Sequence, residues 1–532
     1  MQKYVDDEET ALLQGSGPTK TIIHVNSRSE KVYLLCSLYI GVLLAALDGT
    51  VVASLLYHIA SELGSLSAAP WIASTYMMVS SAFQPLFGKL STTFGRKQCL
   101  LTCHFLFALG SLLSGLSNCV NLLILGRCVQ GIGGGGLIAL SSIIVSDITP
   151  LRERGVYQGI GNISFGIGAS LGGSMGGIIS NKFGWRYAFL GQIVVSFAAI
   201  CLVYLNVNET MLGKDQNVWT QLGNIDFLGS FFLLGAFICF FLGLNLGGSY
   251  MPWKSPQVVI LFLSSLFFSI SFFRAEQRRP ERAIIPLKIF YGATGCLCCV
   301  LCLLSSMAAF SYIFHLPIFM EIVLGRSASY SGIVIALNFV GVLLGSLGSG
   351  LIMKTTCRYK RLLFLCGLLY IVSCGNLWFF DSTTSTTMQM LTICCLGLGY
   401  SSIITISLVA LMAHVPPDVQ AISSSVLYAS RGFGSTVGVA VSSSIFAHLL
   451  RTNLQQFIDG PERKRVIELV LSSSDAVKSL PAPYKAQTIQ SYLSSLKVVF
   501  AFVMILSILI WLASLPLKEH NLSRATDEEA EM

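Results

Sequence analysis

Three ionisable side chains lie deep inside long apolar runs of this sequence, namely Asp48, Arg127 and Arg431, and His104 and His315 are weaker cases. An ionisable residue at mid-membrane costs at least about 2.5–3.5 kcal/mol on insertion scales, so each of the three is a candidate for function. Burial favours the neutral form of a carboxylic acid, which would let Asp48 bind and release a proton or pair with a cationic substrate. The alternative is a structural carboxylate that neighbouring helices satisfy.

The two arginines suggest different roles. Arg127 stays protonated at any pH, so it can tune a nearby carboxylate or hold water but cannot carry the proton itself. A helix-packing ion pair is the alternative for this residue. Ser424, Tyr428 and Ser435 repeat around Arg431 at helical spacing and form one polar stripe. Such a stripe either lines a cavity or makes inter-helix contacts.

The composition requires a membrane around these residues. Of 532 residues, 53% are hydrophobic and 11% are charged, against roughly 25% charged in a soluble domain. The mean hydropathy is +0.71. The net charge of +8 comes from short basic clusters between apolar runs, so no nucleic-acid partner is expected. The sixteen cysteines lie mostly inside apolar runs, where they fit as small apolar fillers. We therefore expect no metal and no cofactor.

Apolar runs long enough to cross a bilayer core about 30 Å thick occur fourteen times. Helices are expected throughout, because each backbone polar group must be satisfied within its own span. The runs cover residues 33–57, 70–88, 98–117, 122–147, 156–180, 187–207, 226–247, 257–275, 293–320, 329–353, 361–380, 387–413, 420–449 and 494–516.

Loop charges predict the orientation. With a cytoplasmic N-terminus, fifteen Lys and Arg residues lie in inside loops and four in the short outside loops, as the positive-inside rule requires. Both ends are therefore expected in the cytoplasm. The predicted parts are an N-terminal tail (1–32), a six-helix half (33–207), a linker with two extra helices (208–292), a second six-helix half (293–516) and a C-terminal tail (517–532). The long outside loop 450–493 has room for a short amphipathic helix.

Glycines crowd two of the spans. Gly131–Gly136 formally matches the nucleotide-binding pattern GxGxxG, but it lies inside an apolar span with no preceding strand. Small residues let membrane helices approach closely, and this explains the run better. A glycine-lined face also lets helices rock, which alternating access requires.

Short motifs in chain order resemble those of the major facilitator superfamily. The loop after the second span reads Gly88-Lys-Leu-Ser-Thr92-Thr-Phe-Gly95-Arg96-Lys97, similar to the signature G-x-L-a-D-r-x-G-r-k. The fourth span carries Arg127-Cys-Val-Gln130-Gly131, similar to R-x-x-Q-G. The fifth carries Gly168-Ala169-Ser-Leu-Gly172-Gly173, similar to the antiporter motif G-P-x-x-G-G. This resemblance implies two six-helix halves, gating roles for the loop and fifth-span glycines, and gating roles for Arg96 and Lys97.

Further motifs resemble the fourteen-span drug–proton antiporter branch of that family. They are Leu47-Asp48-Gly-Thr50-Val51-Val52, Trp185-Arg186, Ile225-Asp226, Pro286-Leu287 and Arg431-Gly-Phe-Gly434. Two positions depart from the family: Thr92 stands where the loop motif has Asp, and Ala169 stands where the antiporter motif has Pro. We expect the cytoplasmic charge relay to be incomplete or rebuilt in consequence.

Within the branch, the chain most resembles the fungal vacuolar basic amino acid transporters. The resemblance implies uptake of lysine, arginine and histidine in exchange for protons, with Asp48 as the proton and substrate residue and Arg127 as the coupling residue. The expected substrate and proton site comprises Asp48, Arg127, Gln130, Tyr428 and Arg431. In the N-terminal tail, Glu8 with Leu12 and Leu13 fits an acidic dileucine address read by a sorting adaptor. Together these features favour the vacuolar membrane.

Two other functions remain open. Multidrug or siderophore efflux at the plasma membrane would use the same fold, since a wide apolar cavity with one carboxylate also suits cationic drugs. A nutrient sensor built on a transporter scaffold would need a long cytoplasmic extension, which the tails 1–32 and 517–532 do not provide. The sequence offers no catalytic constellation for an intramembrane enzyme.

Overall fold

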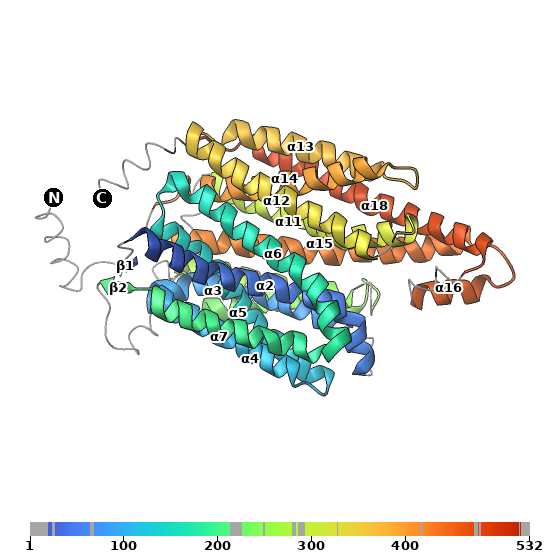
Figure 1. Cartoon of the computed structure of the whole chain (residues 1–532), viewed down its shortest axis with the longest axis horizontal. Coiled ribbons are helices and arrows are strands. Elements are labelled where there is room, and N and C mark those ends of the chain that lie inside the picture. Colours follow the sequence, from blue (N-terminus) through green and yellow to red (C-terminus); the bar gives the residue numbers. More distant parts are fainter. Residues whose placement is uncertain are drawn as a thin grey trace, which may run out of the picture.

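Nearly all described residues of this chain are helical in the computed structural model, and the long helices run side by side (Figure 1). The structure describes residues 20–23, 27–63, 69–212, 226–247, 251–278, 283–285, 293–326, 328–416, 419–472, 477, 480–520 and 522. The helices are α2 (Arg28–Glu62), α3 (Ala69–Phe94), α4 (Arg96–Gly115), α5 (Val120–Ile148), α6 (Leu151–Phe183), α7 (Arg186–Asn206), α9 (Phe227–Leu246), α10 (Pro256–Arg278), α11 (Ala293–Ile318), the π-helix η4 (Phe319–Val323), α12 (Ala328–Thr356), α13 (Lys360–Trp378), α14 (Thr386–His414), α15 (Gln420–Phe457), α16 (Arg463–Ser472) and α18 (Ala482–Ser514). Strands β1 (Lys20–Ile23) and β2 (Glu209–Leu212) form one antiparallel ribbon.

Thirteen helices among the described residues are long and apolar enough to cross a membrane. The predicted span 70–88 forms α3, which has 26 residues but does not belong to that set. Its polar residues Thr75, Ser80, Ser81 and Gln84 are buried. Because α3 packs between α5 and α15, it needs less apolar surface than a helix that faces lipid. The all-helical membrane fold is confirmed, whereas the count of fourteen spans stays a prediction.

The predicted outside loop 450–493 is largely helical. Helix α15 continues to Phe457 and α18 begins at Ala482, twelve residues before the apolar run at 494. Between them, α16 turns the buried residues Val466 and Val470 toward a core that includes Leu454 of α15. Figure 1 shows α16 beside the extended ends of α15 and α18, at one end of the molecule. Helices α15 and α18 thus continue past the apolar runs that predicted them, and an apolar-run criterion does not detect such polar turns.

The helices gather into two groups. Helices α2 to α7 pack on one another and are called the N-terminal bundle; α11 to α15 and α18 do the same and are called the C-terminal bundle. The bundles meet along two seams, α6 against α12 and α3 against α15. The pair α9–α10 packs beside the second seam, where α9 contacts both α3 and α15. The exact boundaries of the two predicted halves remain a prediction.

The glycine run of α5 lies where three helices meet. A Cβ added at Gly133 would stand 2.5 Å from the Cys103 carbonyl oxygen of α4, and one at Gly131 would stand 2.9 Å from the Tyr76 carbonyl oxygen of α3. The backbone of α5 therefore touches both neighbours directly. Close helix packing accounts for this run, as expected from the small size of glycine.

One end of the seam between the bundles is closed. A Cβ added at Gly350 of α12 would stand 2.6 Å from the carbonyl carbon of Gly155 in α6. Beside this contact, Lys354 Nζ donates to Glu153 Oε1 at 2.8 Å. On the other seam, a Cβ added at Gly88 would stand 2.7 Å from Ser425 Cβ. The loops predicted to be cytoplasmic flank these contacts, so the structure represents a state closed at that predicted side.

We predict that Gly350→Leu prevents this closure. The new side chain would meet backbone atoms of Gly155 and Val156, which cannot rotate away. Overpacking of this kind typically destabilises by about 1–3 kcal/mol, so the melting temperature of the detergent-solubilised protein should fall and transport should be lost.

The matched control is Gly348→Leu. It lies on the same helix, and an added Cβ there meets nothing within 4 Å. Equal transport by the two variants would contradict the assignment of the Gly155–Gly350 contact as a required closing contact.

Candidate functional site

Asp48 lies at the centre of a buried hydrogen-bonded cluster. Arg127 Nη1 donates to Asp48 Oδ2 at 2.5 Å, and Gln130 Nε2 donates to Asp48 Oδ1 at 2.9 Å. Arg127 Nη1 also donates to Gln130 Oε1 at 2.7 Å. All three side chains are inaccessible to solvent. Three of the five predicted site residues are therefore in direct contact.

Two residues that sequence reasoning missed complete the cluster. Gln130 Nε2 lies 2.8 Å from Ser111 Oγ of α4 and 3.1 Å from Gln192 Oε1 of α7. The Arg127 guanidinium also lies over the Tyr76 ring, 4.5 Å from its centroid. An uncharged amide inside the apolar run 187–207 was the available signal for Gln192. Four helices of the N-terminal bundle thus converge on one carboxylate.

The chemistry open to this cluster follows from its charges. The guanidinium of Arg127 cannot release its proton, so Asp48 is the member that can change protonation state. In this state the carboxylate is ion-paired and bonded by an amide, which stabilises its charged form. Protonation would weaken the pairing and leave Arg127 without its counter-charge. A purely structural ion pair, the alternative interpretation of Asp48 and Arg127, would make the same contacts.

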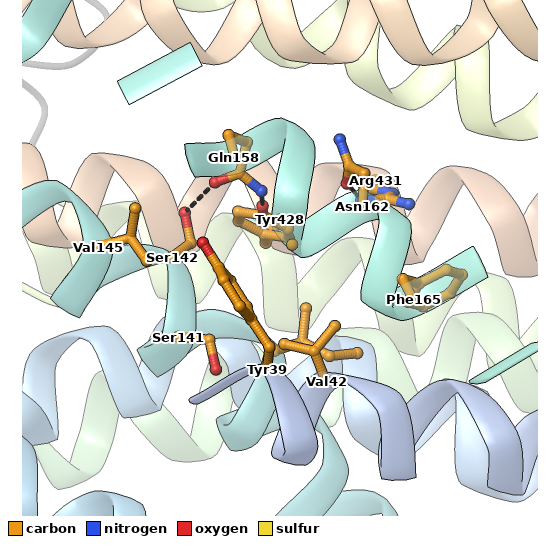
Figure 2. A pocket seen from close by; sticks show the side chains of 12 residues that line it. Tyr39, Val42, Ser141, Ser142, Val145, Gln158, Asn162, Phe165, Tyr428 and Arg431 are labelled. Atoms are coloured by element: carbon orange, nitrogen blue, oxygen red, sulfur yellow. Dashed lines mark hydrogen bonds between the residues drawn. The ribbon is translucent and has the colours of Figure 1, made fainter. Parts of the chain in front are cut away.

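A second polar site lies between the bundles (Figure 2). It is a cavity of about 20 Å³, whereas one water needs roughly 10–15 Å³. Residues of α2, α5, α6 and α15 line it, and they are Tyr39, Val42, Ile138, Ser141, Ser142, Val145, Gln158, Gly161, Asn162, Phe165, Tyr428 and Arg431. This state therefore has room for about one water, and an organic substrate requires the cavity to widen.

Hydrogen bonds cross the cavity between the bundles. Gln158 Nε2 of α6 donates to the Tyr428 hydroxyl of α15, and Ser142 Oγ donates to Gln158 Oε1 at 3.2 Å. Asn162 Nδ2 donates to Ser346 Oγ of α12 at 2.8 Å. Sequence reasoning missed Gln158 and Asn162, although an amide pair four residues apart in the span 156–180 is a readable signal. Both amides join α6 to the opposite bundle.

The predicted site residues fall into two groups. Tyr428 and Arg431 line the cavity, whereas Asp48 does not belong to its lining. Of the predicted stripe, Ser424 donates to the Gln420 carbonyl oxygen and Ser435 to that of Gly432, both within α15. The stripe therefore lines the cavity at Tyr428 and Arg431 but not at Ser424 and Ser435. The sequence suggested one cavity that contains a carboxylate. The structure instead has two separate polar centres, the Asp48 cluster and the cavity that Arg431 lines.

The two centres share helices. Helix α2 carries Asp48 and the cavity residue Tyr39; helix α5 carries Arg127 and the cavity residue Ser142. Gly168 and Gly172 of α6 pack against the α2 backbone at Leu43 and Leu47, and Gly173 follows in the same helix. A displacement of α2 or α5 at one centre therefore moves a wall of the other.

The loop between α3 and α4 holds a rebuilt polar network. Gly95 has φ 100°, a conformation that favours glycine, and this turn directs Arg96 to Asp147 Oδ2 of α5 at 3.1 Å. The Arg96 amide donates to Glu209 Oε2 of β2 at 2.7 Å, so a carboxylate caps the first turn of α4. Thr92 instead donates to the Lys89 carbonyl oxygen of its own helix. Carboxylates of α5 and β2 thus contact Arg96, whereas Thr92 bonds within its own helix, and the rebuilt charge relay stays a prediction.

Lys97 and Gly88 each contact another helix. Lys97 Nζ donates to the Tyr204 carbonyl oxygen at 2.8 Å and lies over the Tyr204 ring. Gly88 touches Ser425 at the closed seam, as described above. The sorting residues Glu8, Leu12 and Leu13 lie outside the described residues.

Comparisons with known proteins agree with this architecture. The Major Facilitator Superfamily profile matches residues 38–439. The chain is 34% identical to "Multidrug resistance protein fnx1" of Schizosaccharomyces pombe, covering 94% of each chain. It is 32% identical to "Vacuolar basic amino acid transporter 2" of Saccharomyces cerevisiae, covering 80% of this chain and 93% of the relative.

A solved structure shares the fold. The proton:xylose symporter XylE, 13% identical, superposes with a TM-score of 0.58 and covers 94% of this chain and 99% of the symporter. The predicted resemblance is confirmed by the profile and by the relatives together. The chain belongs to the major facilitator superfamily and is a membrane transporter rather than an enzyme.

Proposed function

We propose that this protein is a proton-coupled antiporter that moves the basic amino acids lysine, arginine and histidine into the vacuole by alternating access. The observation that carries the proposal is the buried Asp48 cluster on the same helices as the cavity between the bundles. A relative named for vacuolar basic amino acid transport supports the substrate class and the location.

In this mechanism, Asp48 takes a proton from the acidic lumen and releases it to the cytoplasm. Protonation removes the negative charge of Asp48 that attracts Arg127. Gln130 then hydrogen-bonds to a neutral carboxylic acid instead of a carboxylate. Because α2 and α5 carry both centres, this local change biases the shape of the cavity. Antiport results if the widened cavity binds substrate at the cytoplasmic side only when Asp48 is charged.

The second candidate is efflux of drugs at the plasma membrane. A relative named "Multidrug resistance protein fnx1" favours it. The two candidates differ in location and in substrate, so a fluorescently tagged protein and the drug sensitivity of a deletion strain separate them.

We predict that vacuoles isolated from cells lacking this protein lose most ATP-dependent lysine, arginine and histidine uptake. A protonophore should abolish the same uptake in wild-type vacuoles, because the proton gradient drives exchange. Labelled amino acid retained on filters measures it. Full uptake without the protein, in a strain that also lacks its relatives, would rule out this function.

The Asp48→Asn variant should lose proton-coupled uptake, and the structure adds that it should also be unstable. Removing one partner of a buried ion pair costs about 3–5 kcal/mol, because the other charge is left unpaired. The double variant Asp48→Asn/Arg127→Gln removes both charges, so it should recover much of the lost melting temperature without recovering uptake. Uptake at the wild-type level in the double variant would exclude Asp48 as the proton residue.

The sorting role of the tail has its own test. Replacing Leu12 and Leu13 by alanine should move the tagged protein from the vacuolar membrane to the cell surface, because an adaptor reads the leucine pair. Alanine at Thr10, between the acidic residues and the leucines, is the control and should leave the location unchanged. A double-alanine variant that still reaches the vacuole would remove the dileucine as its address.

A further inference from the structure

We propose that Arg431 binds the carboxylate of the transported molecule, so that the cavity accepts amino acids and rejects cations without a carboxylate. This inference rests on the proposed function, because it specifies what the same cavity recognises. It assigns the α-carboxylate, rather than the cationic side chain, as the group that anchors the substrate.

Arg431 is the one charged residue among those that line the cavity. Among the described residues, no carboxylate lies within ion-pair distance of its guanidinium. Its hydrogen bond to Asn162 Oδ1 is 3.5 Å long and therefore weak, and another polar neighbour is the neutral Tyr400 hydroxyl. Arg431 is partly buried, and a charge held beside a cavity inside a protein is normally paired, so this guanidinium is available for an anion that the described residues do not supply.

Arg127 provides the internal comparison. Its guanidinium has the Asp48 carboxylate at 2.5 Å and the Gln130 amide oxygen at 2.7 Å. Arg431 has aromatic rings instead: its guanidinium carbon lies 5.2 Å from the Phe165 centroid and 6.0 Å from that of Tyr428. Contacts with ring faces orient a guanidinium while leaving its N–H donors available.

The chemistry of the group selects a carboxylate. A guanidinium presents N–H donors in a planar fork that matches two carboxylate oxygens, giving paired and charge-assisted hydrogen bonds. A cation without a carboxylate would instead place like charge beside Arg431 in a site of low dielectric. A cationic drug is therefore disfavoured, while an amino acid neutralises the arginine.

The other end of a basic amino acid has neutral partners across the cavity. Tyr39 and Ser141 line the side formed by α2 and α5, away from Arg431 (Figure 2). A tyrosine face attracts a cation, and a hydroxyl oxygen accepts a hydrogen bond from an ammonium group. The widened cavity would hold the substrate with its carboxylate on α15 and its cationic side chain toward α2.

Competition for labelled lysine uptake by isolated vacuoles tests the proposal with the wild-type protein. The competitors are unlabelled lysine, cadaverine, which lacks the carboxylate, and lysinamide, which keeps the α-amino group but has a neutral amide. We expect cadaverine and lysinamide to compete at least about tenfold more weakly than lysine, since two charge-assisted hydrogen bonds are lost.

Variants connect the preference to this arginine. Arg431→Gln should raise the KM for lysine at least about tenfold and reduce its advantage over cadaverine, and Arg431→Lys should retain part of both. Arg326→Gln is the matched control, because Arg326 also stacks on a tyrosine, with its guanidinium carbon 5.3 Å from the Tyr330 centroid, but lies outside the cavity. It should behave as wild type.

The outcomes are distinguishable. Lysine uptake with equal competition by cadaverine overturns the role of the carboxylate while leaving the antiporter function intact. Absence of lysine, arginine and histidine uptake by the wild-type protein overturns the proposed function, and this inference with it. If Arg431→Gln fails to accumulate, the wild-type competition still decides the question.

Discussion

The ion pair between Asp48 and Arg127 is the interaction on which the N-terminal bundle depends. Two full charges inside a membrane protein are costly unless each is paired and hydrogen-bonded. Here Gln130 bonds both charges, and Ser111 of α4 and Gln192 of α7 hold the Gln130 amide, while Arg127 Nε has no hydrogen-bond partner among the described residues. The glycines of α5 and α6 let these helices pack closely against α2, α3 and α4, which brings the polar side chains of the cluster together. The polar cluster around Asp48 therefore depends on the close packing of these helices.

In the proposed antiporter, that arrangement separates proton chemistry from substrate chemistry. The carboxylate lies within one bundle, whereas the cavity lies between the two, so neither a proton nor a substrate needs to displace the other directly. The link is mechanical, because α2 and α5 pass through both centres. Gln158 and Asn162 then connect the cavity to α15 and α12 of the other bundle. A change in the protonation of Asp48 can in this way be transmitted to the seams between the two bundles.

The sequence predicted most of the fold because hydropathy alone marks helices that face lipid. It was less informative about α3, whose polar residues face protein, and about the first turns of α18, which lie outside the apolar run. Asp48 and Arg127 were predictable as rare charges in apolar spans. Gln192 and Asn162 were visible only as amides inside apolar spans, and their partners could not be predicted because these come from helices distant in the chain. The separation of Asp48 from Arg431 likewise depends on tertiary packing, which the spacing of residues along one helix cannot predict.

The contact between Gly155 and Gly350 has a consequence for the speed of the transport cycle. Glycine has no rotamers, so closing this part of the seam freezes no side chain, and opening it releases none. The side-chain entropy change of this step comes from the flanking residues Glu153 and Lys354. Their ion pair is partly exposed, so dissolved salt screens it. A gate built from bare backbone can therefore switch with a small entropic barrier, and its equilibrium responds to the ionic strength of the adjacent solution.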